Sequence, residues 1–173
     1  VAAVCPPIDP AGDVFVDEVL VPSLATSFGI SPDRKRMYIA TRTDPSLTFI
    51  DLNESLDVSD PSQKTELLKC DDGDNRRCAD SRRRGNDPDD NPRQVKLPPE
   101  PVGMVTLPVN DAADAASPST ANFVMMAHRG GQVSLFFDDA TAAGPSLIQV
   151  LEDVTPEPTG ITYDATTQRA YLS

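Results

Sequence analysis

The residues best suited to bind a metal lie in a short acidic run, Asp71-Asp72-Gly73-Asp74-Asn75, which Asp80 follows. Closely spaced carboxylate and amide oxygens are the ligands that Ca²⁺ prefers. The match to an EF-hand loop is partial, because Gly73 comes directly after Asp72 and Arg76 stands where a ligand belongs. The alternative, which we favour, is a solvated charge run whose aspartates pair with nearby arginines. Calcium binding is the only cofactor hypothesis that we keep. Its candidate ligands are Asp71, Asp72, Asp74, Asn75 and Asp80.

Two cysteines flank this run, and their spacing favours a disulfide bond. Cys70 and Cys78 enclose a glycine-containing turn, so in an oxidising compartment they would close a small ring. A pair of free thiols in a cytosolic chain is the alternative. Zinc is not expected, because the spacing is not Cys-x-x-Cys and the only histidine, His128, lies far along the chain. Cys5 has no assigned partner.

Signatures of common enzyme classes are absent from the sequence. It contains no Gly-x-Ser-x-Gly elbow, no phosphate-binding glycine loop, no paired-histidine zinc motif and no Cys-x-x-Cys-His. Catalytic residues therefore cannot be assigned from motifs, and we expect none, with His128 as a weak candidate for a general base. A lone histidine in a turn is more often an ordinary structural residue.

The elements that would position these residues follow from an internal repeat. Three stretches place a glycine before an apolar residue after a turn-forming segment, at Gly29, Gly103 and Gly160. Each leads into a strand, a polar turn and a second strand, with a longer excursion in the middle copy. Further apolar runs follow, and those expected to close each unit lie at residues 14–21, 94–97 and 147–151. The pattern predicts antiparallel units of four short strands.

At these residues the chain resembles the YVTN-type β-propeller repeat that lactonase-like propellers share. The resemblance rests on a Pro-x-Gly-like start, Arg36-Met37-Tyr38-Ile39-Ala40 and the run Ser46-Leu47-Thr48-Phe49-Ile50-Asp51-Leu52. It covers about two units and parts of two more, and it implies an all-β fold of propeller blades. The ring would be incomplete, so remaining blades would come from a parent chain or another subunit. A β-sandwich is the alternative.

The expected single partial propeller spans residues 1–173. Residues 1–26 would end a preceding blade, residues 27–100 and 101–156 would each form a blade, and residues 157–173 would start the next. The first complete blade carries a long charged insertion at residues 53–93, and the second carries one at residues 109–122. We expect the charged insertion to be an exposed excursion, since it offers almost nothing apolar to fold.

Composition narrows the classes of partner. The formal net charge is −12, which argues against nucleic acid or an anionic membrane as the main partner. No run approaches the length of a transmembrane segment, and the first residues do not resemble a signal peptide. Seventeen prolines, nine glycines and no tryptophan favour a turn-rich, all-β module. We expect a periplasmic, cell-surface or extracellular protein.

The repeat predicts where the two insertions lie. Because chain direction alternates within a four-stranded unit, connections after strands one and three emerge on the same face, and insertions gathered on one face often mark a binding side. Neutral drift in loops is the alternative. On the opposite face, the resemblance to lactonase-like propellers implies ligand contacts by Arg42, Asp44, His128 and Arg129.

Two classes of function follow from these features. The preferred one is a noncatalytic scaffold of the cell envelope or exterior that binds a protein or glycan through the insertion-bearing face. The other is a propeller-type lactonase or hydrolase acting at the central channel. An extracellular structural subunit that assembles through exposed sheet edges is a third possibility.

Overall fold

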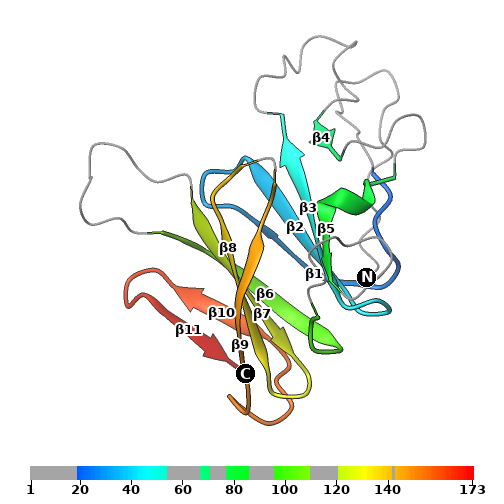
Figure 1. Cartoon of the computed structure of the whole chain (residues 1–173). Coiled ribbons are helices and arrows are strands. Elements are labelled where there is room, and N and C mark those ends of the chain that lie inside the picture. Colours follow the sequence, from blue (N-terminus) through cyan, green and yellow to red (C-terminus); the bar gives the residue numbers. More distant parts are fainter. Residues whose placement is uncertain (1–18, 54–66, 71–76, 86–95, 110–120, 142) are drawn as a thin grey trace, which may run out of the picture.

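The fold is all-β, as the sequence predicts. A computed structural model describes residues 19–53, 67–70, 77–85, 96–109, 121–141 and 143–173, and within them it contains antiparallel sheets and one turn of 3-10 helix, η3 (Asp80–Arg82) (Figure 1). No helix among these residues is long and apolar enough to cross a membrane.

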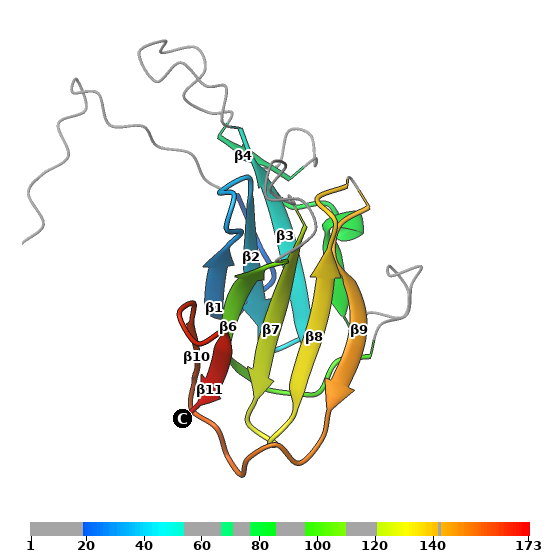
Figure 2. The ribbon, with the colours of Figure 1, turned by 90° about the vertical axis from the view of Figure 1, so that its left-hand side faces the viewer.

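The strands form three antiparallel sheets that follow one another along the chain. The first sheet consists of β1 (Ala25–Ile30), β2 (Arg36–Thr41), β3 (Ser46–Leu52), β4 (Leu68–Lys69) and β5 (Arg83–Gly85), with β4 and β5 both pairing with β3. The second sheet has the order β6 (Pro101–Pro108), β7 (Asn122–His128), β8 (Val133–Asp138) and β9 (Ser146–Leu151), which Figure 2 shows side by side. The third sheet pairs β10 (Ile161–Asp164) with β11 (Arg169–Leu172).

Irregular backbone features recur at matching places in these sheets. The ladder shifts register between Ala25 and Ser27 in β1 and between Pro101 and Gly103 in β6. Three non-glycine residues with left-handed φ recur at one offset, each three residues before Ser27, Gly103 or Gly160: Leu24 (58°), Glu100 (52°) and Glu157 (46°). Such a conformation is uncommon for residues with a Cβ atom, so its recurrence supports an internal repeat.

The strand pairing shows that the three glycines do not all occupy the same position of the repeat. Gly103 lies opposite Ala127, and at the corresponding place the Gly160 carbonyl accepts a backbone hydrogen bond from the Ser173 amide. Gly29 lies opposite Tyr38, two residues further along its strand, and the counterpart of Gly103 in the first sheet is Ser27. The expected equivalence of Gly29 with the other two glycines is therefore wrong. Because a shift of two residues keeps the same side of a strand, Gly29 and Gly103 both still face the next sheet.

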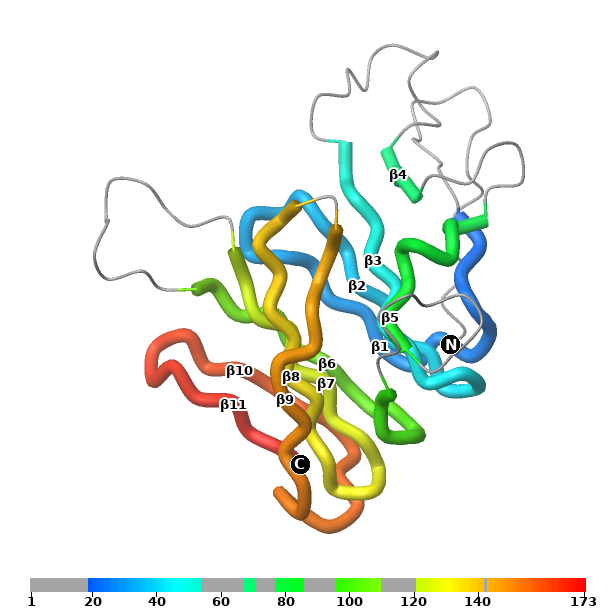
Figure 3. Tube along the Cα trace, in the orientation of Figure 1, coloured from blue at the N-terminus to red at the C-terminus, as the bar shows by residue number. Residues whose placement is uncertain are grey.

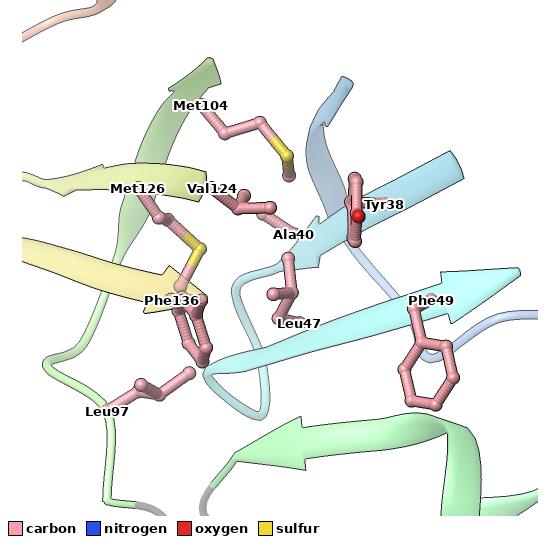
Figure 4. Packing of buried hydrophobic residues seen from close by; sticks show 9 residues of the cluster. All are labelled: Tyr38, Ala40, Leu47, Phe49, Leu97, Met104, Val124, Met126 and Phe136. Carbon is pink, nitrogen blue, oxygen red and sulfur yellow. The ribbon is translucent and has the colours of Figure 1, made fainter. Parts of the chain in front are cut away.

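The three sheets stack face to face in chain order (Figure 3). We call the side of a sheet that packs on the next one its forward face, and the other side its rear face. The core lies between the first two sheets (Figure 4) and consists of Tyr38, Ala40, Leu47 and Phe49 from the forward face of the first, Met104, Val124, Met126 and Phe136 from the rear face of the second, and Leu97. The alternation of buried residues along each strand explains why these side chains meet.

The first strands of the three sheets lie next to one another through this stacking. A Cβ atom added at Gly29 would lie 3.1 Å from the Thr106 side chain in β6, and one added at Gly103 would lie 3.2 Å from the Ile161 amide nitrogen in β10. The Ser27 hydroxyl accepts a 3.1 Å hydrogen bond from the Met104 amide. Small residues at these positions allow the close approach of neighbouring strands.

Part of the rear face of the first sheet is covered by a segment that we expected to be an exposed excursion. Cys70 and Cys78 form the predicted disulfide bond and pack with Ile50 in a second apolar cluster. Val19, Val21 and Leu68 join it. Residues 53–93 are therefore not entirely an excursion: the described parts add two short strands and a buried disulfide to the first sheet.

One expected closing strand is misplaced. Residues 147–151 lie in β9 as predicted, but Leu97 is a buried core residue outside any strand. The fourth position of the first sheet is filled by β4 at one end of β3 and by β5 at the other. The sequence did not reveal this, because the Arg-rich β5 has no apolar pattern.

Removing the disulfide should destabilise the protein measurably. The Cys70→Ala/Cys78→Ala variant is expected to lose about 2–3 kcal/mol of unfolding free energy, since the bond closes a short loop and both side chains are buried. Urea unfolding of the variant and of the unreduced protein would measure the loss. Cys5→Ala provides a control for thiol chemistry elsewhere, and an unchanged midpoint in the double variant would contradict the expected role of the bond.

Candidate functional site

The two insertions begin at the same end of the stacked sheets. The chain leaves β3 at Leu52 and β6 at Pro108, and backbone hydrogen bonds close the base of each connection, from Asn53 to the Leu67 carbonyl (2.9 Å) and from Val109 to the Ala121 carbonyl (3.2 Å). The Thr106 hydroxyl donates to the Ile30 carbonyl at this end, which holds the two sheets in line. We call it the insertion-bearing end.

A buried polar group anchors this end, and we call it the Arg36 cluster: Arg36, Tyr38, Asp51, Asn122 and Asp138. The Arg36 guanidinium donates to both Asp138 oxygens (2.8 and 2.9 Å) and to Asp51 (2.7 Å). The Tyr38 hydroxyl lies 2.6 Å from Asp138 and 3.1 Å from the Asn122 side chain. Arg36 and Tyr38 belong to the first sheet, whereas Asn122 and Asp138 belong to the second. The cluster therefore locks the two sheets in a single register.

Arginines of the charged insertion extend this cluster around one aromatic ring. The guanidinium carbons of Arg36, Arg82 and Arg84 lie 4.9, 5.1 and 5.1 Å from the centroid of the Phe49 ring. Arg82 also pairs with Asp51 at 2.5 Å, and Arg84 donates to the Pro145 carbonyl at 3.0 Å. Cation–π contacts of this kind are strongest where water is excluded. The basic residues here are structural and tie the insertion to both sheets.

The chemistry of the cluster favours structure over catalysis. Burial raises the pKa of the Tyr38 hydroxyl far above its ordinary value, and the hydrogen bond to the Asp138 carboxylate raises it further. A phenol in this setting stays protonated at any physiological pH and acts only as a hydrogen-bond donor. The adjacent pocket, lined by Ser31, Asp33, Lys35, Ala140 and the cluster itself, has a volume of about 70 Å³. That volume accommodates a few water molecules but no substrate of ordinary size.

A second, larger pocket lies beside the disulfide bond. It measures about 140 Å³ and is lined by Leu20, Val21, Pro22, Thr48, Arg77, Cys78, Ala79, Asp80 and Arg83. The Thr48 hydroxyl is buried there, and no hydrogen-bond partner for it is found in the described part of the chain. A water molecule would satisfy this hydroxyl.

The four residues that the resemblance implied as ligand contacts lie at the opposite end of the sheets. Arg42 and Asp44 belong to the β2–β3 connection, His128 ends β7, and Arg129 begins the β7–β8 connection. Asp44 forms an ion pair with Arg83, and Arg129 lies 3.5 Å from Glu100. The Nε atom of Arg42 is buried and, among the described residues, has no hydrogen-bond partner. Matching backbone hydrogen bonds, Arg42 to Leu24 and Arg129 to Glu100, give the two arginines equivalent positions.

His128 is part of the core and not of an open site. Its side chain is 0% exposed, its Nε2 lies 2.9 Å from the Ser134 hydroxyl, and its Nδ1 lies 3.3 Å from the Pro99 carbonyl. Burial lowers the pKa of His128 to about 4, so the ring is neutral at neutral pH. A general base must reach the proton that it abstracts, and this ring is closed off from any ligand in the described structure.

Lowering the pH should destabilise the protein through His128. Its folded pKa of about 4 lies below the ordinary 6.5, so the unfolded chain takes up a proton first as the pH falls. The contribution of neutral His128 to the free energy of unfolding is roughly 3 kcal/mol. It is fully present above pH 6.5 and is lost as the pH falls from about 6.5 to 4. Urea unfolding at pH 7 and pH 4.5 would show a smaller pH-dependent loss in His128→Asn than in the parent. Equal losses would contradict the assignment.

The calcium candidates fall mostly outside the described residues. Asp71, Asp72, Asp74 and Asn75 are not described, and Asp80 lies in η3 with its carboxylate 4.0 Å from Arg77. Within the described ranges, no group of three or more His, Cys, Asp or Glu side chains is arranged to hold a metal ion.

Comparisons with known proteins do not assign a family. The chain matches no protein-family model, and a search of curated proteins finds no relative. Function is therefore inferred from the arrangement of the sheets and the chemistry of their two ends.

Proposed function

We propose that the chain is part of a β-propeller that works as a noncatalytic binding module of the cell envelope or exterior, with the insertion-bearing end as its binding side. The observation that carries the proposal is the repeated stacking of β1, β6 and β10, in which each first strand lies against the next. Sheets that pack in this way, each turned relative to the last, are the building blocks of propellers. The buried disulfide fits an oxidising compartment.

The binding side is inferred from the contrast between the two ends. At the insertion-bearing end, the Arg36 cluster holds both sheets rigidly beneath two long connections. Variable loops on a rigid scaffold are a common arrangement for recognition. At the other end, Asp44 and Arg129 form ion pairs and His128 is buried. This favours binding over the alternative of hydrolysis at a channel, and a protein or a glycan is the expected partner.

Shortening one insertion separates folding from binding. Replacing residues 110–120 by a short Gly-Ser turn is expected to change the unfolding free energy by less than about 1 kcal/mol, because the Val109 to Ala121 hydrogen bond closes the loop at its base. The same variant should lose the partner. Thermal unfolding and a glycan array, together with crosslinking to envelope proteins, would measure the two effects.

The buried arginines of the charged insertion are unsuitable for testing binding by mutation. Charge changes at Arg82 or Arg84 would disturb the fold, since both stack on Phe49, so the second binding variant replaces residues 54–66 instead. Retention of every ligand by both shortened variants would contradict the proposed binding side. Lactone hydrolysis by the parent protein, if unaffected by both replacements, would favour the enzyme alternative.

A further inference from the structure

The pocket of about 140 Å³ beside the disulfide bond lies on the rear face of the first sheet. Its lining comes from β3, from β5, from the segment 77–80 and from residues 20–22. The Cys78 amide donates a 2.9 Å hydrogen bond to the Leu20 carbonyl, which joins two of these walls. All of these parts belong to the first sheet or to the chain beside it, so no further sheet is needed to form the pocket.

The feature of this pocket that calls for a ligand is the hydroxyl of Thr48. Leu47 and Phe49 belong to the core between the first two sheets, so Thr48 between them faces the other way, toward the pocket. Thr48 is 1% exposed, and its Oγ1 atom has no hydrogen-bond partner in the described part of the chain. A buried hydroxyl without a partner is costly, so a ligand that offers an acceptor here is favoured.

Two arginines give the same pocket a basic character. Arg83 is the ladder partner of Thr48, so the two side chains lie side by side on one face of the sheet. Arg77 comes from the neighbouring segment, and its side chain is 66% exposed. It approaches the Asp80 carboxylate only at 4.0 Å, and such an exposed pair contributes little. The Arg77 guanidinium can therefore turn to a bound anion at small cost.

The lining selects a small ligand with one negative charge and an apolar tail. Asp44 already pairs with Arg83, which leaves Arg77 as the cation for a ligand to pair with. A second negative charge on the ligand would be repelled by Asp80. Residues 20–22 supply an apolar wall. An apolar cavity of roughly 150 Å³ admits benzene, so this pocket has room for about six non-hydrogen atoms.

We propose that this pocket binds a short-chain monocarboxylate of the size of butyrate. The carboxylate accepts a hydrogen bond from the Thr48 hydroxyl and pairs with Arg77, while the hydrocarbon tail packs on residues 20–22. The site lies apart from the connections of the insertion-bearing end and does not rest on the function proposed for them. Water is the competing occupant, since it would also satisfy the hydroxyl.

The test is an NMR titration of the full chain with sodium butyrate at pH 7 and constant ionic strength. Saturable shifts are expected for the amide signals of Thr48 and of residues 77–80, with a Kd on the order of 1 mM for a ligand of this size. The affinity should rise roughly fourfold per methylene group from acetate to butyrate, since each group buries more apolar surface. Octanoate should bind no more tightly than butyrate, because its tail exceeds the pocket.

Two variants assign the contacts. Thr48→Val keeps the shape of the side chain but removes the hydroxyl, and it should weaken butyrate binding at least about tenfold. It should melt at or above the temperature of the parent, because the lost hydroxyl has no partner among the described residues. Arg77→Met removes an exposed guanidinium and should weaken binding about three- to fivefold without unfolding the chain. Arg169→Met, at an exposed arginine in β11, should leave the affinity unchanged.

Two further probes test the class of ligand. Butyramide has the size of butyrate without its charge and should bind more weakly, and inorganic phosphate should give no saturable shift. If butyrate gives no saturable shift, the pocket holds water only and the proposal is overturned. Unchanged affinity in both Thr48→Val and Arg77→Met, or tighter binding of phosphate than of butyrate, would also overturn it. These results do not involve residues 54–66 or 110–120, so they leave the proposed binding side to its own test.

Discussion

Replacing Asp138 by alanine is expected to lower the unfolding free energy by about 3–5 kcal/mol, because it leaves the buried Arg36 guanidinium without its principal partner. The substitution also removes the nearer of the two acceptors of the Tyr38 hydroxyl and the side-chain acceptor of the Ala140 amide. Urea unfolding followed by circular dichroism would measure the loss, with an unchanged m-value showing that the denatured state is the same.

Two companion variants sharpen this prediction. Asp139→Ala removes the exposed carboxylate next in sequence and should cost less than about 1 kcal/mol. The double variant Arg36→Met/Asp138→Leu should be less destabilised than Asp138→Ala, since it removes both charges and does not strand one. A cost of under about 1 kcal/mol for Asp138→Ala would show that the ion pair does not hold the sheets together.

Replacing Gly144 by alanine is expected to be the other strongly destabilising change, at about 2–5 kcal/mol. Gly144 has φ +71° in the β8–β9 connection, a conformation that costs a residue with a Cβ atom energy. An added Cβ atom would also overlap the Phe49 ring, which is held in place by the three arginines around it. The ring cannot move aside without disturbing those contacts.

A matched glycine provides the control. At Gly130 an added Cβ atom would lie 2.6 Å from the Oε1 atom of Gln132, at the end of a flexible side chain that can move away. Gly130→Ala should therefore cost less than about 1 kcal/mol in the same thermal or urea unfolding experiment. Similar losses for the two variants would contradict the tight packing of the β8–β9 connection on Phe49.

Local patterns predicted the strands but not how they meet. Alternating apolar residues and turn-forming residues indicated β2, β3 and β7 through β9, and the spacing of Cys70 and Cys78 indicated their bond. The sequence comparison aligned Gly29 with Gly103 and Gly160, which is wrong by two residues. In the first unit, Ser27 occupies the position that Gly103 and Gly160 occupy in the other two. A serine there is invisible to a search for a repeated glycine.

Long-range partners could not be predicted from one sequence. Arg36 and Asp138 are 102 residues apart, and no local periodicity joins them. In the sequence, Arg82 and Arg84 look like part of a solvated charge run. In the structure the Phe49 ring contacts both, the Asp51 carboxylate pairs with Arg82, and the Pro145 carbonyl accepts from Arg84, and these contacts compensate their burial. The one available signal was the recurrence of Arg-x-Tyr at residues 36–38 and 169–171, which marks a shared position but not its partner.

The central claim is that successive sheets stack through their first strands, and a nuclear Overhauser spectrum of the labelled protein tests it most directly. The structure predicts cross peaks from the Gly29 α protons to the Thr106 methyl group and from the Gly103 α protons to the Ile161 side chain, since these groups lie in contact. If the cross peaks within each sheet are present while both of these are absent, the sheets do not stack in this way and the account is wrong.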